Sequence, residues 1–319
     1  MFALTLIILW DKIKAIKLFE SDVKLMIIDA HNHAEWEMYD SRTLIRDMDS
    51  LGIEKTWLLS WNLPQITDFG EYEKLNDGGF IFNKQCASVS VPFLHCVDYK
   101  NSAPDRYVLG YAPNPLQPNP IDCFKEAVEK YDIRICGEVI FRAPYNCDEL
   151  IEIFRICGDR NMPVVLHIDF ENGKTLLDGT VLPPVWTYGG NREVIEDMLT
   201  RCPKTNFIGH ASFWKYISGE YKNPSHNGNP ELFKENGILP ELLAAHGNLY
   251  CDMSAGSGYT AVSRDLEYSK KLITQFPDRF LYGRDSIKNI HIPLIDSLEL
   301  PLDVKKLVMY GNAKRLVRE

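Results

Sequence analysis

Short apolar runs alternate along the chain with segments whose apolar residues recur at helical spacing, and this alternation repeats eight times. Such runs, apolar at nearly every position, are typical of parallel strands that are buried on both faces. The eight runs are Leu25–Ala30, Lys55–Trp61, Arg106–Ala112, Ile133–Phe141, Pro163–Asp169, Thr205–His210, Asn248–Met253 and Arg279–Asp285.

The intervening segments predict helices that cover the strands. Ser41–Leu51 keeps helical spacing and is followed by Gly52, a residue that commonly ends helices. Asn146 or Asp148 is expected to cap the helix whose apolar face starts at Leu150. The other expected helical segments are Ile121–Tyr131, Asn191–Thr200, Ser263–Phe276 and Leu302–Val317.

Eight strand–helix units in this order predict an α/β fold of the (β/α)₈ TIM-barrel type over residues 26–319. The alternative is an open, doubly wound sheet. However, no GxGxxG, GxxxxGKS or GxxxxGKT motif follows any of the runs. No linker divides the segment, so one barrel domain is expected.

Residues 1–25 are predicted to be an extension outside the barrel. Met1–Trp10 is almost entirely apolar, but ten residues are too few to span a bilayer as a helix. Its lysines follow the apolar stretch, whereas those of a secretory signal precede it. We therefore expect no stable membrane insertion. Two interpretations stay open: an amphipathic extension, or a natural start at Met26.

Composition narrows the class of partner. The chain has 45% hydrophobic and 25% charged residues, as globular proteins do, and a net charge of −9. No dense basic stretch is present, so nucleic acid is not an expected partner. The eight cysteines are scattered without a CxxC pair, which favours a reducing compartment and predicts a cytoplasmic protein. A small-molecule substrate is expected, and assembly into a homo-oligomer is left open.

Polar residues that can bind metal or carry protons lie where the predicted strands end. The active site of a (β/α)₈ barrel lies at the carboxyl ends of its strands, so these residues are the first candidates. They are Asp29, His31 and His33 at the first run, Glu138 in the fourth, His167 in the fifth, His210 in the sixth, Asp252 and Ser254 in the seventh, and Asp285 in the eighth.

The spacing of His31 and His33 predicts a metal site. Residues two apart on a strand point to the same side, so both imidazoles can face one point. With His167 and Asp285 they form three nitrogen ligands and one oxygen ligand, a set suited to a divalent ion such as zinc. Such an ion lowers the pKa of a bound water towards neutrality, and Asp285 would orient that water and take its proton.

The roles of three further residues stay open at this point. His210 could bind a second metal or polarise a substrate carbonyl as a catalytic residue. Glu138 could be a ligand, a bridge between two metals, or a residue behind the ligands. Asp29 is interpreted as a structural residue that lies one layer deeper than His31 on the same side of the strand. One ion is the first expectation and two are the alternative.

Three further residues are candidates for contact with the substrate. Arg142, just beyond the fourth run, could bind a substrate carboxylate through its planar guanidinium. Ser254 and Trp214 could also reach the substrate, Trp214 as part of an aromatic wall with Trp186 and Tyr188. For each of them the alternative is a packing or salt-bridge role.

Several of these motifs resemble those of the amidohydrolase superfamily, in its amidohydrolase-related (amidohydrolase 2) branch. The resemblance covers residues 25–318 and is carried by IDAHNH, VVLHID, FIGHASFW, LYGRDS and the closing YGNAKRLV. It implies a metal-dependent enzyme with His31, His33, His167 and Asp285 as ligands and His210 as a ligand or catalytic residue. The chain departs from the well-known members because no lysine lies in ICGEVIF, where they carry a metal-bridging carboxylated lysine; Glu138 is the ionisable residue there.

The resemblance implies first a hydrolase that uses a metal-activated water on a C–N or C–O bond of a small amide, lactone or ester. A non-oxidative decarboxylase of a small unsaturated or aromatic acid is the alternative in the same branch. A non-catalytic metal- or ligand-binding barrel is the third hypothesis, disfavoured because the full set of ligands is present.

Overall fold

The computed structural model of the chain describes residues 26–62, 90–115, 117–141, 143–168, 189–217 and 237–317. The predicted extension over residues 1–25 lies outside this part, as do Arg142, Trp186 and Tyr188. Among the described residues, no helix is both long enough and apolar enough to cross a membrane.

Eight parallel strands form a barrel, as the alternating pattern predicts. The sheet order is β1-β2-β5-β6-β7-β8-β9-β10, so neighbours in the sheet are neighbours along the chain. The last strand returns to the first, because Ala30 N–H donates to the Tyr282 carbonyl at 2.9 Å and Asp285 N–H to the His31 carbonyl at 2.8 Å. The strands are β1 (Ile27–Asn32), β2 (Ile53–Leu59), β5 (Tyr107–Tyr111), β6 (Ile133–Val139), β7 (Val164–His167), β8 (Phe207–His210), β9 (Leu249–Asp252) and β10 (Phe280–Leu281).

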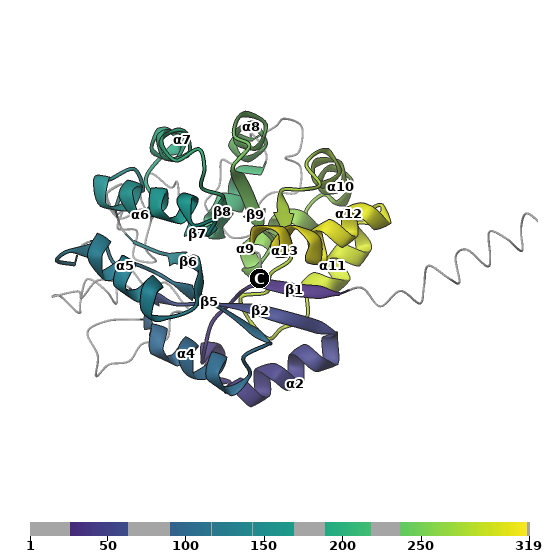
Figure 1. Cartoon of the computed structure of the whole chain (residues 1–319). Helices are drawn as coiled ribbons and strands as arrows, with labels where there is room; N and C mark the ends of the chain where they lie inside the picture. Colours follow the sequence, from purple (N-terminus) through teal and green to yellow (C-terminus); the bar gives the residue numbers. More distant parts are fainter. Residues whose placement is uncertain are drawn as a thin grey trace, which may run out of the picture.

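Helices surround the barrel (Figure 1). α2 begins where the Asp40 carboxylate accepts the Thr43 N–H at 2.8 Å, and it ends at Gly52, whose φ of 72° suits a glycine. The α-helices are α2 (Ser41–Leu51), α4 (Phe93–Ser102), α5 (Pro120–Lys130), α6 (Asp148–Asp159), α7 (Arg192–Arg201), α8 (Ile238–Ala245), α9 (Ala255–Ser263), α10 (Leu266–Gln275), α11 (His291–Ser297), α12 (Leu302–Lys306) and α13 (Asn312–Leu316). The short elements are η1 (Trp36–Met38), η3 (Ala211–Ile217), η4 (Leu307–Gly311) and the antiparallel pair β3 (Trp61–Asn62) and β4 (Ser90–Val91).

Successive residues of each strand divide between two apolar layers. One layer packs between the strands and the outer helices, and it holds most of the buried side chains. The other fills the inside of the barrel and takes at least one residue from every strand. The strand residues of this inner layer are Ile28, Ala30, Trp57, Leu59, Val108, Ile135, Val165, Ile208, Tyr250 and Leu281. The period of two in each run therefore decides which positions face the barrel axis.

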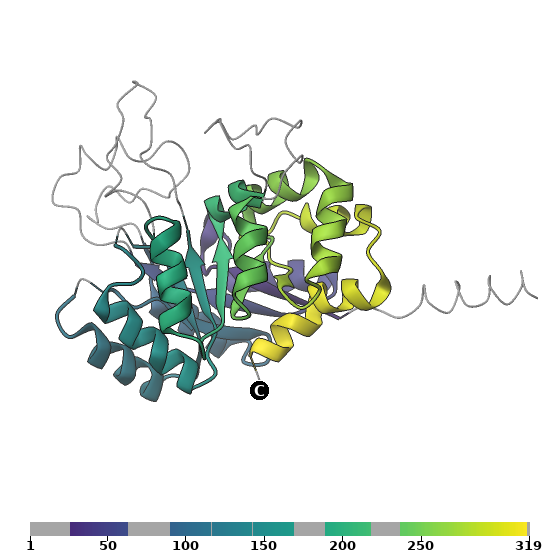
Figure 2. The same ribbon diagram turned by 90° about the horizontal axis from the view of Figure 1, so that it is seen from above.

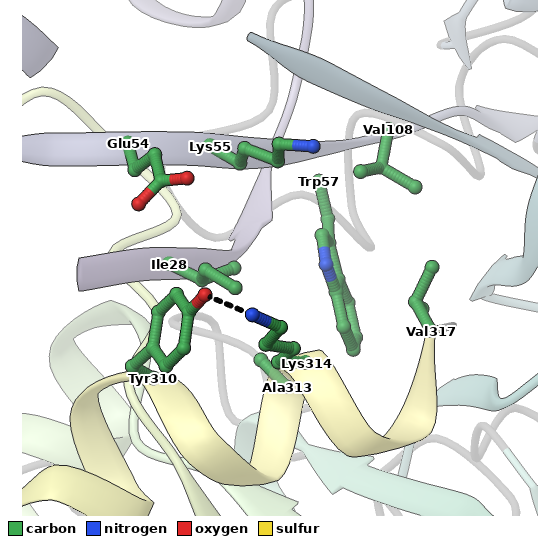
Figure 3. A pocket seen from close by; sticks show the side chains of 9 residues that line it. All are labelled: Ile28, Glu54, Lys55, Trp57, Val108, Tyr310, Ala313, Lys314 and Val317. Carbon is green, nitrogen blue, oxygen red and sulfur yellow. Dashed lines mark hydrogen bonds between the residues drawn. The ribbon is translucent and has the colours of Figure 1, made fainter. Parts of the chain in front are cut away.

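One end of the barrel is covered by α13, whose Ala313 and Leu316 join the inner layer. In the turned view, the yellow segment that contains α13 lies at that end (Figure 2). A cavity of about 360 Å³ opens beside α13, next to the first residues of β2 (Figure 3). Its lining residues are Ile28, Glu54, Lys55, Trp57, Val108, Tyr310, Ala313, Lys314 and Val317. None of them is a predicted site residue, so this cavity is separate from the candidate chemistry at the other strand ends.

Two local predictions, the start of one helix and the cap of another, differ from the structure. The expected helix Ser263–Phe276 corresponds to α10, which begins three residues later, at Leu266, because Asp265 caps it by accepting the Tyr268 N–H at 2.9 Å. The N-cap of α6 is Cys147, which makes no side-chain cap, while the Asn146 amide donates to Asp197 at 2.9 Å. The remaining helix predictions agree with α2, α5, α7 and the α12–η4–α13 segment to within a few residues.

Candidate metal centre

Three predicted site residues follow directly from the alternation of the inner layer. His167, His210 and Asp252 each lie two residues after an inner-layer residue, namely Val165, Ile208 and Tyr250. They therefore face the barrel axis one layer nearer the carboxyl end of the strands. Their side chains meet there: the His167 and His210 rings are 5.7 Å apart, and the His210 ring contacts Asp252.

His31 reaches the same place through an irregularity in β1. Ile28 and Ala30 face the inside of the barrel, so simple alternation would turn His31 outwards. The pairing of β1 with β2 shifts register between Asp29 and Asn32, and the His31 side chain is fully buried in the polar cluster. β6 has a similar shift between Cys136 and Val139, around Glu138. These two departures from regular pairing bring His31 and Glu138 to the axis.

The Glu138 carboxylate lies at the centre of four imidazoles. Its Oε1 is 2.7 Å from His167 Nδ1 and 3.8 Å from His210 Nε2. Its Oε2 is 3.4 Å from His33 Nε2 and 3.6 Å from His31 Nε2. Burial would raise the pKa of Glu138, but the hydrogen bond with His167 and the nearby His31 outweigh it and hold that pKa well below its usual range.

Asp285 completes the cluster from the segment after β10. Its Oδ1 is 3.2 Å from His33 Nε2, and its Oδ2 is 3.9 Å from His210 Nε2. The Asp285 backbone is left-handed, with a φ of 56°, a conformation that Asp and Asn tolerate better than most residues. Burial would raise the pKa of Asp285, yet the adjacent His33 keeps it below the usual value.

Three of the imidazoles that face the centre are held in place by contacts of their Nδ1 atoms. His33 Nδ1 is 2.7 Å from the Leu59 carbonyl, which accepts the ring N–H and leaves Nε2 facing Asp285. His31 Nδ1 and His210 Nδ1 both contact the Asp252 carboxylate, at 2.9 and 3.1 Å. Such contacts fix the orientation and tautomer of metal-binding histidines in other proteins.

The donors present fit a divalent cation. Three overlapping groups of potential ligands have their atoms within 4.8 Å of one another. These are His31 with His33 and Asp285, Glu138 with His167 and His210, and His31 with His210 and Asp252. Within the described chain, His31 Nε2 and Asp285 Oδ1 are buried and lack a hydrogen-bond partner. An unpartnered imidazole nitrogen beside several carboxylates is an environment that a cation would stabilise.

The pKa values of His31 and Asp252 also favour a cation at this position. Burial would lower the pKa of His31, but the charge and hydrogen bond of Asp252, together with Glu138, raise it well above the usual value. The pKa of Asp252 is correspondingly held below its usual range, because the two adjacent histidines outweigh the opposing effect of its burial. Positive charge is thus favoured at this point of the barrel, whether a proton or a metal ion supplies it.

The predicted substrate contacts are placed differently from one another. Ser254 is fully buried and contacts His210 Nδ1 at 2.9 Å, so it belongs to the support of the histidines. Trp214 is only 1% exposed and donates its indole N–H to the Asp252 carbonyl at 2.5 Å, behind the centre. The substrate-contact predictions for both residues stay predictions, and the Arg142 prediction lies outside the described residues.

The sequence patterns did not indicate two supporting features. The Trp36 indole donates to the Asp285 carbonyl at 2.9 Å, and its ring lies 5.5 Å from that of His33. Asp29 does not lie beneath His31 as expected: its carboxylate accepts from Arg284, which also pairs with Asp47 on α2. The alternation of β1 could have indicated the direction of Asp29. Its neighbours Ile28 and Ala30 face the barrel axis, so the residue between them faces away from it.

Comparison with known proteins places this centre on a shared fold. No family model and no curated protein matches the sequence. Among solved structures, the 2,6-dihydroxybenzoate decarboxylase from Rhizobium has a TM-score of 0.55 at 13% identity, with 91% of this chain and 98% of that chain covered. The comparison establishes a TIM barrel.

Two further solved structures resemble this chain to a similar degree. A dihydroxybenzoic acid decarboxylase from Polaromonas, solved with bound manganese and 2-nitroresorcinol, has a TM-score of 0.54 at 14% identity, covering 91% of this chain and 96% of that one. A protein from Staphylococcus aureus, named as an inferred amidohydrolase, has a TM-score of 0.54 at 15% identity, covering 92% and 99%. At these identities the likeness extends to the TIM barrel and leaves the reaction open.

Proposed function

We propose that this protein is a divalent-metal-dependent hydrolase of a C–N or C–O bond in a small polar molecule, such as an amide, lactone or ester. The supporting observation is the convergence of the imidazole Nε2 atoms of His31, His33 and His210 on the Glu138 and Asp285 carboxylates. The amidohydrolase-like motifs of the sequence add support, as does the amidohydrolase named among the structural neighbours.

In this proposal the metal is held by His31, His33, His167 and Asp285, with Glu138 and His210 as further candidate ligands. When bound, the metal would polarise a carbonyl group and lower the pKa of a water. Zinc suits the nitrogen-rich ligand set, whereas one structural neighbour was solved with manganese. Analysis of the metal that copurifies with the protein distinguishes the two. One ion per chain is proposed; two would assign Glu138 as the bridge between them.

The chain's own residues divide the remaining work. Asp285 is proposed to take a proton from the attacking water and deliver it to the leaving group, since its side chain is partly accessible and contacts His33. His210 is proposed to stabilise negative charge on the substrate oxygen through Nε2, which faces the centre. The inner apolar layer beneath the centre excludes water from the side opposite the mouth.

The test is a metal analysis of the purified protein followed by a screen of lactones, esters and amides. Metal-dependent hydrolysis is expected, with its loss in His31→Ala and its strong reduction in Asp285→Asn. A protein that carries no divalent metal and gains none on addition of zinc or manganese would contradict the proposal.

Non-oxidative decarboxylation is the second candidate function, because two of the structural neighbours are named as dihydroxybenzoate decarboxylases. In that reaction the substrate C–C bond to the carboxylate breaks, carbon dioxide leaves, and Asp285 or His210 delivers a proton to the carbon. Release of carbon dioxide from hydroxybenzoates, without hydrolysis of any ester or amide in the screen, would select this candidate. A cytoplasmic location and the absence of nucleic-acid partners remain predictions.

A further inference from the structure

Asp252, at the end of β9, lies between two histidines of the centre and contacts both. Its Oδ2 is 2.9 Å from His31 Nδ1, and its Oδ1 is 3.1 Å from His210 Nδ1. The two imidazole rings are 4.1 Å apart and tilted by 33°. All three side chains are almost completely buried, so water does not compete for these contacts.

We propose that Asp252 is a positioning residue that sets the tautomer and orientation of His31 and His210 together. The inference rests on the proposed metal centre, because its consequence is that both Nε2 atoms face that centre with their lone pairs free. In this role Asp252 touches neither substrate nor metal; it acts through the two rings. The sequence placed Asp252 only among the polar residues at the predicted strand ends, without a partner.

The hydrogen bonds around the carboxylate support this role. The Ser254 N–H donates to Asp252 Oδ1 at 3.1 Å, and the Ser254 hydroxyl donates to the same oxygen. With these donors in place the carboxylate acts as an acceptor, so each imidazole must present its N–H at Nδ1. The Ser254 oxygen also lies 2.9 Å from His210 Nδ1 and can share that N–H.

The backbone of Asp252 is held as firmly as its side chain. Trp214 donates its indole N–H to the Asp252 carbonyl, and its ring packs 6.0 Å from that of Phe280 in β10. This contact ties η3, which directly follows His210, to the strand that carries Asp252. The distance between His210 and Asp252 is thereby controlled from both sides.

Substitution by asparagine separates positioning from folding. Asn has the shape of Asp, but its amide offers one accepting oxygen and one donating NH₂ group. It can accept an N–H from one imidazole, whereas its NH₂ faces the Nδ1 of the other. That second histidine must then carry its proton on Nε2, which points an N–H at the metal and removes a lone pair.

The experiment compares the full-length wild type with Asp252→Asn, Ser254→Ala and the surface control Asp159→Asn. The tautomers of His31 and His210 in the metal-free proteins are read by long-range ¹⁵N NMR of the imidazoles at a pH high enough for both rings to be neutral, and zinc and manganese affinities by competition with a chelator. Asp159 pairs with Lys204 where both side chains are exposed, so its variant is expected to match the wild type.

We expect both histidines to be protonated on Nδ1 in the wild type and one of them on Nε2 in Asp252→Asn. Metal affinity should fall about 10- to 100-fold in Asp252→Asn, the size seen when such supporting carboxylates are lost, and by less in Ser254→Ala. Unchanged tautomers and an affinity within twofold of wild type, in a folded Asp252→Asn, would overturn the proposal.

Two further outcomes of the experiment also have a defined meaning. If Asp252→Asn does not fold by circular dichroism, the wild-type tautomers and Ser254→Ala carry the test, and an Nε2 proton on either wild-type histidine refutes the proposal. If no substrate is hydrolysed by the metal-loaded wild type, the proposed function fails, while the tautomer and affinity measurements still judge Asp252.

Discussion

The Arg284 guanidinium forms an ion pair with the Asp29 carboxylate at 2.8 Å, and both side chains are completely buried. Asp29 lies two residues before His31, and Arg284 directly precedes Asp285. The pair therefore joins the first and last strands at the point where the barrel closes and holds two proposed ligands in register. A second pair, from Arg284 to Asp47, fixes the same guanidinium to α2.

Removing one partner of this pair should destabilise the fold strongly. Asp29→Ala leaves the Arg284 charge buried beside a single remaining carboxylate, so the free energy of unfolding should fall by about 3–5 kcal/mol. Chemical denaturation measures it. The control is Lys204→Ala, which breaks an exposed pair with Asp159 and should cost no more than about 1 kcal/mol. Similar losses in the two variants would show that the buried pair does not hold the barrel closed.

Asp285→Asn should impair catalysis without unfolding the protein. Asparagine tolerates the left-handed backbone at this position, where φ is 56°, but it cannot take up a proton. The value of kcat should fall about 10²- to 10⁴-fold, as expected on loss of a general base. Steady-state kinetics on metal-saturated protein measures the change, and thermal unfolding checks the fold. A variant with near-wild-type kcat would remove Asp285 from the proton transfer.

Metal removal should lower both activity and stability. An ion that binds only the folded state adds about 2.7 kcal/mol when its free concentration is a hundred times Kd. Dialysis against a chelator should therefore lower Tm, and added zinc or manganese should restore it. The matched control is His31→Ala, whose Tm should respond little to either treatment because one ligand is missing. An equal response in both proteins would place the metal elsewhere.

Stability should decline in mildly acidic solution partly because of His291. Its ring is buried and donates to the Ala255 carbonyl at 3.0 Å, and burial holds its pKa below the usual value. The unfolded chain therefore takes up a proton near pH 6.5 while the folded protein does not, so stability falls as the pH drops below that point.

The variant His291→Gln should lack this part of the decline. Denaturant unfolding between pH 5 and 8 should give a shallower loss for His291→Gln than for the wild type. Each curve is referred to the stability of the same protein at pH 8, so that the comparison isolates the slope from any change in overall stability. Parallel curves for His291→Gln and the wild type would contradict the assignment.

Much of the site could be predicted because its residues lie at the ends of successive strands. A barrel of parallel strands puts all carboxyl ends on one side, so polar residues at the ends of apolar runs must meet there. His167, His210 and Asp285 follow from that rule alone. His31 and Glu138 were named for the same reason, but their direction depends on register shifts in β1 and β6 that no local pattern marks.

The partners of the supporting residues could not be predicted in this way. Asp252 contacts His31 across 221 positions of sequence, and Arg284 contacts Asp29 across 255. Each of these side chains could equally serve a surface or a packing role when read by itself. Their partners are decided by which strands become neighbours and by how the last strand meets the first.

The sequence alone determined the succession of strands and helices, the layer that each regular strand position enters, and the residue types available at the strand ends. These are local properties, set by periodicity and chain order. Only the tertiary structure decided which nitrogen of each histidine faces the centre, which carboxylate holds it, and that Asp29 turns away to Arg284. Those choices depend on distances between segments far apart in the chain, where hydrogen-bond geometry and burial act together.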